Sequence, residues 1–554
     1  MFRESSYDQL SFTDRFYSAG KQAQNAVDKS RAKLVGDIIY PNVDEKRFAD
    51  IYSSVDSRPN ITIKRYFCAF VLKRMYGLSD EVFIEFLRCG ALNFQYALHT
   101  TNEETQPLSK SSLIRFRNAV TAYNEEHGCD LIKEEFERIS RIMAIDMGLL
   151  HEDPSENDDG DHVVIVRMDS MEIEAHAKSM ARVEILYMTN VILIRYLLKK
   201  GFKNVIPPQL AHYLEEGDHN KVTYYRVAAD MKAGIQDTRV SEIVSEMLLL
   251  KESMQNCFSE KILSGIPEYQ VFLRVLDEQT YTDINGMRLP KDKKDISSDS
   301  VQNPFDTTAT YRFKGGHHRG HVLNVGEAID GNGNGIIINA ALKPNTTSDN
   351  SMAIDYVKNL PDGSGEQILT ADGAYNSDEL EAIASQKNVK VQTTSLVGKA
   401  PEDIVADFEL DASGEKIISC PAGNAPTSCK YNSKNGYITA TMPNNCCASC
   451  PHRDECKAKV NNKKNRSTVR VTSKMVARAR QARNFSTEEG KANAKRRNGV
   501  EGIMSVMRRK YKLDHIQVFS IHKLKSWIWA SLLSYNLVKY QKYKASLAKQ
   551  LSAA

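Results

Sequence analysis

Three acidic residues stand where a carboxylate can do chemistry. Asp169 follows the β-branched run at residues 163–166, and Asp372 ends the apolar stretch in "EQILTADGAYNS". Glu501 lies in a basic segment with helical periodicity. An ionised carboxylate at the end of a buried strand is unfavourable unless something compensates its charge. A bound metal ion would compensate Asp372, and so would a solvated turn, in which aspartate is common; the sequence leaves both interpretations open.

If the three carboxylates converge at the edge of a sheet, they offer only hard oxygen ligands. Such ligands suit Mg²⁺ or Mn²⁺ better than zinc. Two of these ions ~3.5–4 Å apart can activate an attacking oxygen and stabilise a leaving one in phosphoryl transfer. The pattern therefore predicts a site for two divalent metal ions that acts on phosphodiesters.

Basic residues surround Glu501. Arg497 precedes it by four positions and Arg508 follows it by seven, so the three share one helical face. Arg509 and Lys510 come directly afterwards. These cations could hold DNA phosphates beside a metal ligand. An intrahelical salt bridge, worth a few tenths of a kcal/mol, is the simpler alternative.

The charge of the chain is unevenly distributed. Residues 457–554 contain 24 Lys and Arg against 4 Asp and Glu, although the whole chain of 554 residues carries a net charge of only +4. A basic end on a near-neutral protein indicates a polyanionic partner. The length predicts several domains. The N-terminus lacks an apolar signal core, and no apolar run is long enough to span a bilayer, so we expect a cytoplasmic protein that does not enter membranes.

Six of the ten cysteines lie between residues 420 and 456. In a cytosolic chain, such clustering favours metal binding over disulfides. Four thiolates fit a closed, structural zinc site, and we predict that the ligands are Cys420, Cys447, Cys450 and Cys456. Cys446 or Cys429 could replace one of them, and a set of reduced thiols is the alternative.

The order of the remaining segments predicts an α/β protein. Residues 1–150 have helical periodicity, and an acidic linker leads from them to the strand that carries Asp169. Helical text follows, then two β-type segments around the turn "GNGNG", a helix capped by Ser348, and the strand that ends at Asp372. This order predicts a mixed sheet.

Other basic residues are candidates for contact with DNA. Arg115 and Arg117 lie on a predicted helix that could be the second helix of a helix-turn-helix, or a plain bundle helix. Lys314 and Arg319 lie in "KGGHHRGH". That stretch could contact phosphates, and its three histidines also suggest metal binding, but a simple turn is the favoured interpretation. Asp306 and Asp349 are possible supporting groups for the metal site. Apolar surroundings place Trp527 and Trp529 in a core rather than against bases.

Three stretches resemble the signatures of DDE transposases from bacterial insertion sequences. They are "RMDSMEIEAHAKSMARVEILY", "LTADGAYNS" and "RRNGVEGIMSVMRRKY". The closest similarity is to the insertion-sequence eleven-eighty-two group, related to the IS-four and IS-five types. "RPNITIKRYFCAFVLKRMYGLSDE" and the cysteine motifs before Glu501 resemble that group too. The resemblance covers most of residues 45–540.

The resemblance implies an RNase H-like catalytic domain in which Asp169, Asp372 and Glu501 bind two Mg²⁺ or Mn²⁺ ions. It implies cut-and-paste DNA transposition, with cleavage and strand transfer at terminal inverted repeats. The partners would be double-stranded DNA, from the element ends and the target, and a second copy of the chain in the DNA complex. The location would be the bacterial nucleoid. A catalytically silent DNA-binding descendant and a plain metal-dependent nuclease are the alternatives.

The expected domain organisation follows from these segments. It comprises an N-terminal helical DNA-binding domain at 1–150, an RNase H-like core at 161–176 and 300–400, a helical insertion at 177–299, a zinc-binding insertion at 401–470 and a basic helical part with Glu501 at 471–554.

Overall fold

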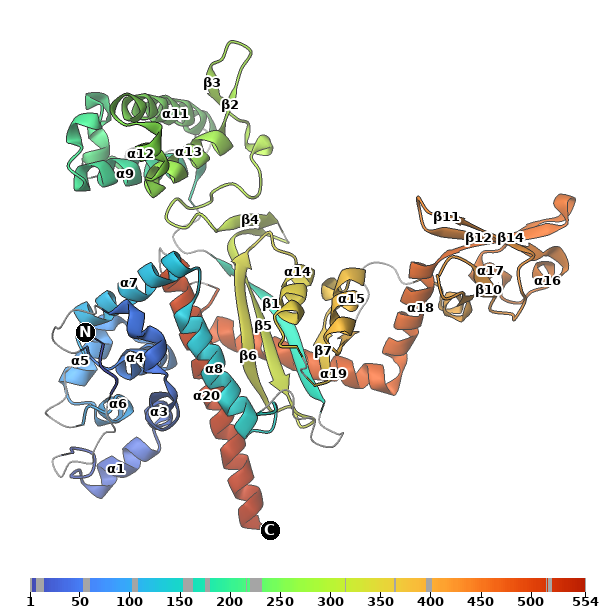
Figure 1. Ribbon diagram of the computed structural model, residues 1–554, viewed down its shortest axis with the longest axis horizontal. Coiled ribbons are helices and arrows are strands. Elements are labelled where there is room, and N and C mark those ends of the chain that lie inside the picture. The colour runs from blue at the N-terminus through green and yellow to red at the C-terminus, as the bar shows by residue number, and fades with distance from the viewer. Residues whose placement is uncertain are drawn as a thin grey trace.

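The computed structural model describes residues 2–5, 14–52, 60–101, 108–152, 163–174, 180–215, 217–219, 232–313, 315–362, 365–394, 401–514, 516 and 521–553. These residues form an elongated molecule around a central sheet (Figure 1). N-terminal helices lie on one side of the sheet, a helical lobe lies beyond one end of it, and a small β-rich lobe lies farthest from the N-terminal helices. No helix in the described residues is both long and apolar enough to cross a membrane.

The N-terminal part is helical. Its elements are α1 (Lys21–Asp28), α2 (Arg31–Leu34), the π-helical turn η1 (Val35–Ile39), α3 (Tyr40–Asn42), η2 (Glu45–Ile51), α4 (Ile63–Tyr76), α5 (Asp80–Arg88), α6 (Leu92–Ala97), α7 (Lys110–His127) and α8 (Leu131–Asp146). Helix α4 is buried on most of its surface. It ends at Gly77, whose φ of 68° is the left-handed conformation that glycine adopts without strain.

The central sheet contains β1 (Val164–Glu174), β4 (Thr310–Phe313), β5 (His317–Ile329), β6 (Gly335–Pro344), β7 (Gln367–Ala371) and β8 (Val389–Thr393). The order is β4-β5-β1-β7-β8, and β6 also pairs with β5. Strands β1, β7 and β8 run parallel, whereas β5 is antiparallel to β1, β4 and β6. The predicted mixed α/β sheet is confirmed.

Helices connect and cover the sheet. They are α14 (Asp349–Lys358), the 3₁₀ turn η6 (Gly373–Tyr375), α15 (Asp378–Gln386), α18 (Ser473–Ser486), α19 (Glu488–Arg509) and α20 (Ile521–Ala553). Ser348 caps α14 as predicted, because its hydroxyl accepts from the Ser351 N–H. Asn536 of α20 bonds both backbone groups of Ile337 in β6. One hydrophobic core therefore runs from the N-terminal helices through the sheet to α19 and α20.

Two lobes have hydrophobic cores of their own. The helical lobe contains α9 (Arg182–Lys199), η3 (Lys203–Val205), η4 (Pro208–Leu214), α11 (Lys232–Cys257), α12 (Glu260–Ser264), α13 (Pro267–Gln279), β2 (Thr280–Thr282), β3 (Arg288–Pro290) and η5 (Lys293–Asp295). The β-rich lobe contains η7 (Asp403–Asp407), β9 (Glu409–Leu410), β10 (Ile417–Ser419), β11 (Ser428–Asn432), β12 (Tyr437–Pro443), α16 (Asn444–Ala448), α17 (Arg453–Cys456), β13 (Lys459–Asn461), η8 (Asn462–Lys464) and β14 (Arg466–Thr472).

Two local predictions are wrong. The stretch from His317 to His321 is not a turn but the start of β5, where it pairs with β4 and β1. The strand that carries Asp169 is also longer than the β-branched run suggested, so Asp169 lies within β1 and not at its end. β1 and β5 are longer than expected because each is the antiparallel partner of the other, which local composition does not reveal.

Candidate active site

The parallel strands β1 and β7 bring Asp169 and Asp372 to the same edge of the sheet. Arg167 is level with Thr370, and β7 ends one residue later. Continuing that register by two residues places Asp169 level with Asp372. Beyond the end of β7, β1 is paired only with β5 among the described strands, so Asp169 has no strand neighbour on its β7 side.

Asp372 caps a turn, as one of the two interpretations of its sequence predicts. Its Oδ1 accepts a hydrogen bond of 2.7 Å from the Ala374 N–H and so caps the turn η6. Its Oδ2 lies 4.0 Å from Nη2 of Arg497. The turn thus fixes the carboxylate while one oxygen remains directed towards the site.

Arg497 connects the three predicted acids. Its Nη2 lies 3.3 Å from Oδ2 of Asp169, and its Nη1 lies 3.1 Å from Oε1 of Glu501. The contact with Glu501 is the intrahelical pair that the spacing predicts, but the same guanidinium also reaches both strand carboxylates. The structure therefore brings together three acids, of which the outermost two, Asp169 and Glu501, are more than 300 residues apart in the sequence.

The electrostatics of this cluster favour a cation. Burial raises the pKa of Asp169, and the negative charges of Asp372 and Asp349 raise it further. The Arg497 charge and the Ser170 N–H oppose that rise. Asp349 is held close by, because the Ser170 hydroxyl donates to its Oδ1 over 2.6 Å. Positive charge is needed here to keep the carboxylates ionised together.

The donor set fits hard divalent ions. All three side chains supply carboxylate oxygen, the ligand type that Mg²⁺ and Mn²⁺ prefer. In the part of the chain that the structure describes, no three acidic, histidine or cysteine side chains are arranged to hold a metal ion as they stand. At the acid cluster, the guanidinium of Arg497 supplies the positive charge between the carboxylates.

Helix α19 is anchored to β1 by residues that sequence reasoning missed. The buried Arg167 forms an ion pair with Glu327 of β5, which is also buried. Its Nη1 donates to the Arg496 carbonyl over 2.8 Å. A Cβ on Gly499 would lie only 1.8 Å from that Nη1. Arg167 and Gly499 each stand two positions before a predicted acid, but that spacing does not by itself indicate a contact between them.

The predicted zinc ligands also lie together. Cys420, Cys447, Cys450 and Cys456 line one small cavity in the β-rich lobe, and Cys446 lines it too. Burial raises the pKa of the Cys447 thiol, and the neighbouring thiols raise it further. Cys429 does not line this cavity; its S–H faces the Ile417 carbonyl at 3.7 Å.

The basic residues predicted to contact DNA have different surroundings. Arg115 is exposed on α7, whereas Arg117 is paired with Asp80. Arg319 donates to the Met180 carbonyl over 2.8 Å. Lys314 lies outside the described residues. Three exposed cations lie at the end of α19: Arg508 and Arg509 are its last residues, and Lys510 follows them.

Two family models match the chain. The model "Transposase domain (DUF772)" matches residues 22–119, which run from the second residue of α1 to Ala119 within α7. The model "Transposase DDE domain" matches residues 419–541, which include the cysteine cavity and α19 with Arg497 and Glu501. No curated protein and no solved structure matches in the same comparisons.

The order of these two matches agrees with the arrangement of the molecule. The first covers the N-terminal helices, and the second covers the helix whose glutamate meets Asp169 and Asp372 through Arg497. A DDE domain implies divalent metal ions, DNA cleavage and strand transfer. The chain is a DDE transposase of insertion sequences, a DNA-binding enzyme.

Proposed function

We propose that Asp169, Asp372 and Glu501 are the catalytic acids, and that the enzyme moves an insertion sequence by cut-and-paste transposition at its terminal inverted repeats. The observation that carries this assignment is the contact of one guanidinium, that of Arg497, with all three carboxylates. A single carboxylate would be enough to pair with Arg497, so a structural ion pair does not explain why three acids from different parts of the chain meet there. Two divalent metal ions, Mg²⁺ or Mn²⁺, would replace this charge when bound and would supply Lewis acidity at the scissile phosphate.

We infer an RNase H-like core from the placement of these acids. The two aspartates come from neighbouring parallel strands in the middle of the sheet, and the glutamate comes from a helix packed against β1 and β7. Each carboxylate is oriented by its own element. Asp372 caps η6, Asp169 accepts from the Ser170 N–H over 2.9 Å, and Glu501 pairs with Arg497 one helical turn away.

Arg497 has a second task in this proposal. Its side chain is only 16% exposed, and its Nε is buried without a hydrogen-bond partner among the described residues. With the acids neutralised by bound metal ions, the guanidinium would be available to hold a DNA phosphate by paired hydrogen bonds. Positioning and charge stabilisation account for nearly all catalysis in phosphoryl transfer, so no side-chain nucleophile is required.

The test compares wild type with Asp372→Ala on DNA that carries the terminal repeats, with Mg²⁺ or Mn²⁺. We expect Asp372→Ala to bind the DNA as wild type does and to cut it at least ~10³-fold more slowly, because a lost metal ligand removes several kcal/mol of transition-state stabilisation. Asp378→Ala is the matched control, since its carboxyl is 91% exposed at the start of α15.

Each other outcome of that test has a clear meaning. Equal cutting by Asp372→Ala would overturn the assignment of the acids. Cutting by wild type without joining to a second DNA would indicate a nuclease. Binding without any cutting by wild type would indicate a silent DNA-binding protein. Gel filtration of the DNA complex tests the proposed pairing of two copies at paired ends.

We also propose that Cys420, Cys447, Cys450 and Cys456 bind one structural zinc ion. Their shared cavity and the mutual effect of the thiols on the pKa of Cys447 support this set. Purified wild type should contain one zinc per chain by mass spectrometry of metals, and Cys447→Ser should contain little and melt earlier. Cys257→Ser, at an exposed thiol of α11, should keep its zinc. A wild-type protein purified without chelators and free of zinc would refute the proposal.

A further inference from the structure

A cavity of about 650 Å³ lies between the N-terminal helices and the C-terminal part of the chain. One wall comes from α4, α5 and α7, and the other from the segment after α19 and the start of α20. The cavity is separate from the acid cluster, because none of Asp169, Asp372 and Glu501 lines it.

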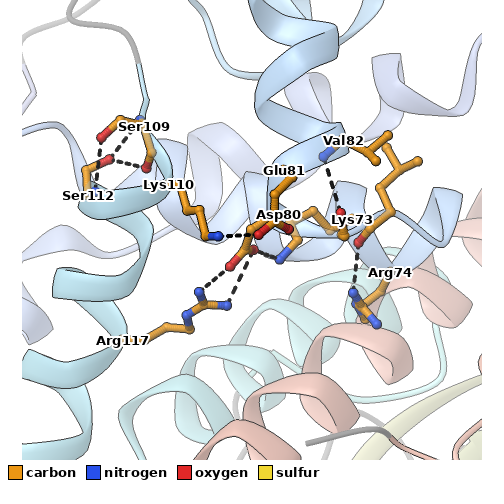
Figure 2. Close-up of polar contacts among 11 residues, drawn as sticks. Lys73, Arg74, Asp80, Glu81, Val82, Ser109, Lys110, Ser112 and Arg117 are labelled. Carbon is orange, nitrogen blue, oxygen red and sulfur yellow. Dashed lines mark hydrogen bonds and ion pairs between the residues drawn. The ribbon is translucent and has the colours of Figure 1, made fainter.

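The lining of this cavity is strongly basic. Its charged residues are six cations and a single acid: Lys73, Arg74, Arg117, Lys510, Lys512, Lys523 and Asp80. Asp80 lies between Lys73 and Arg117 and pairs with both, as Figure 2 shows. The other four cations have no carboxylate partner within salt-bridge distance among the described residues. The cavity therefore has a surplus of positive charge.

Two N–H donors in the lining have no acceptor. Nε of Arg117 and Nε1 of Trp527 are buried, and neither has a hydrogen-bond partner in the described part of the chain. Arg74 stacks on the Trp527 ring, with its guanidinium carbon 3.3 Å from the ring centroid. Buried donors without acceptors are rare in native proteins and call for an explanation. An oxyanion in the cavity would supply acceptors as well as negative charge.

The titration behaviour of the lining agrees with this shortage of negative charge. Burial lowers the pKa of Lys73 to about 8, and the nearby Arg117 and Arg74 charges lower it further, although Asp80 opposes them. Burial likewise lowers the pKa of Arg74 to about 10. Burial also lowers the pKa of Lys510, and the positive charges of Arg31 and Lys542 lower it further.

We propose that this cavity binds a backbone phosphate of the DNA, at a point where a strand bridges the N-terminal helices and the end of α19. This inference rests on the proposed function, since it assigns a second grip to the same DNA. The positive charge continues outside the cavity on the exposed Arg508 and Arg509. Such a spread suits a polyanion rather than a small free anion.

The geometry separates this grip from the cutting site. Lys510 follows Glu501 by nine residues, which is about 14 Å along a helix axis and half a rotation around it. The phosphate in the cavity is therefore not the scissile one. Its contribution is to affinity and register, because phosphate contacts position a protein on DNA.

The experiment measures binding of a fluorescent terminal-repeat duplex to Lys512→Ala/Lys523→Ala by anisotropy at several salt concentrations. Both side chains are exposed, and neither forms an ion pair within the part of the chain that the structure describes, so we expect the fold to be retained. We expect about tenfold weaker binding near 0.15 M salt and a slope of log K against log salt that is smaller by about one to two. Trp527→Phe, which removes the N–H donor and leaves a smaller ring beneath Arg74, should weaken binding a few-fold.

The control is Lys293→Ala/Lys294→Ala, two exposed lysines on the helical lobe, which should bind as wild type does. Unchanged affinity and salt slope in Lys512→Ala/Lys523→Ala would overturn the inference. Competition of inorganic phosphate with DNA in wild type, but not in Lys512→Ala/Lys523→Ala, would support the inference. Phosphate that binds in the cavity without changing the affinity for DNA would indicate a small-anion site and would overturn the inference. These binding data do not depend on cleavage, so a failure of the proposed catalytic acids would be seen separately, in the Asp372→Ala comparison.

Discussion

Replacing Gly499 by alanine is expected to slow DNA cutting by about 10²-fold and to lower the stability of the protein. A Cβ at this position would lie 1.8 Å from Nη1 of Arg167 and 2.6 Å from its guanidinium carbon. Arg167 cannot move aside cheaply, because it is buried and held by Glu327 and the Arg496 carbonyl. Helix α19 must therefore shift away from β1 and carry Arg497 and Glu501 with it.

The expected sizes follow from packing and from catalytic geometry. Overpacking in a well-packed core costs about 1–3 kcal/mol. A displacement of ~1 Å at a catalytic group can lower the rate by about 10². Thermal unfolding and the cleavage assay give the two values for the same protein sample.

Gly502→Ala is the matched control. It lies three residues further along the same helix, is exposed, and a Cβ there would have no neighbour within 4 Å. Alanine has a better helix propensity than glycine by about 1 kcal/mol, so Gly502→Ala should be as active as wild type and slightly more stable. Equal behaviour of the two alanine variants would show that α19 does not depend on the close approach at Gly499.

Replacing Glu327 by glutamine should destabilise the protein by about 3–5 kcal/mol, because it leaves the Arg167 charge buried without its counter-ion. Both side chains of this pair are at most 5% exposed. The free energy of unfolding in urea, compared with wild type, measures the effect. Since Arg167 also donates to the Arg496 carbonyl, the loss should extend to cutting activity.

Glu488→Gln provides the comparison for an exposed pair. Glu488 contacts Lys491 within the first turn of α19, and its carboxyl is 91% exposed. Surface ion pairs contribute about 0–1 kcal/mol, so this change should be nearly neutral. If Glu327→Gln were as mild as Glu488→Gln, the buried pair would not anchor α19.

The elements that depend on local sequence were predictable. Asp372 directly follows a strand and caps a turn, Ser348 caps a helix, and the "GNGNG" stretch joins β5 and β6 in a hairpin. Each of these features depends on residues close together in the chain, where turn and capping chemistry acts. The mixed sheet followed from the order of such elements.

Contacts between distant segments were not predictable from the same sequence. The contact of Arg497 with Asp169 joins residues 328 positions apart, and the Arg167 pair with Glu327 joins residues 160 apart. The extent of β1 depended on its partner β5, which composition alone does not specify. Tertiary packing decides these contacts, and it overrides local preference.

Basic residues show the same limit. Local sequence marked Arg117 as a possible DNA contact, but the fold pairs it with Asp80 in the wall of a cavity. Lys512, Lys523 and Trp527 could be grouped only from the fold, in which they line the same cavity. Charge composition identified the class of partner, whereas the fold was needed to identify the side chains that form one surface.

The central claim is that Asp169, Asp372 and Glu501 together bind the divalent ions. Electron paramagnetic resonance of free Mn²⁺, during titration into the protein with terminal-repeat DNA, tests it most directly. Wild type and Glu488→Gln should bind two ions per chain, and Asp169→Asn, Asp372→Asn and Glu501→Gln should each lose at least one. Unchanged Mn²⁺ binding in all three variants would contradict the claim.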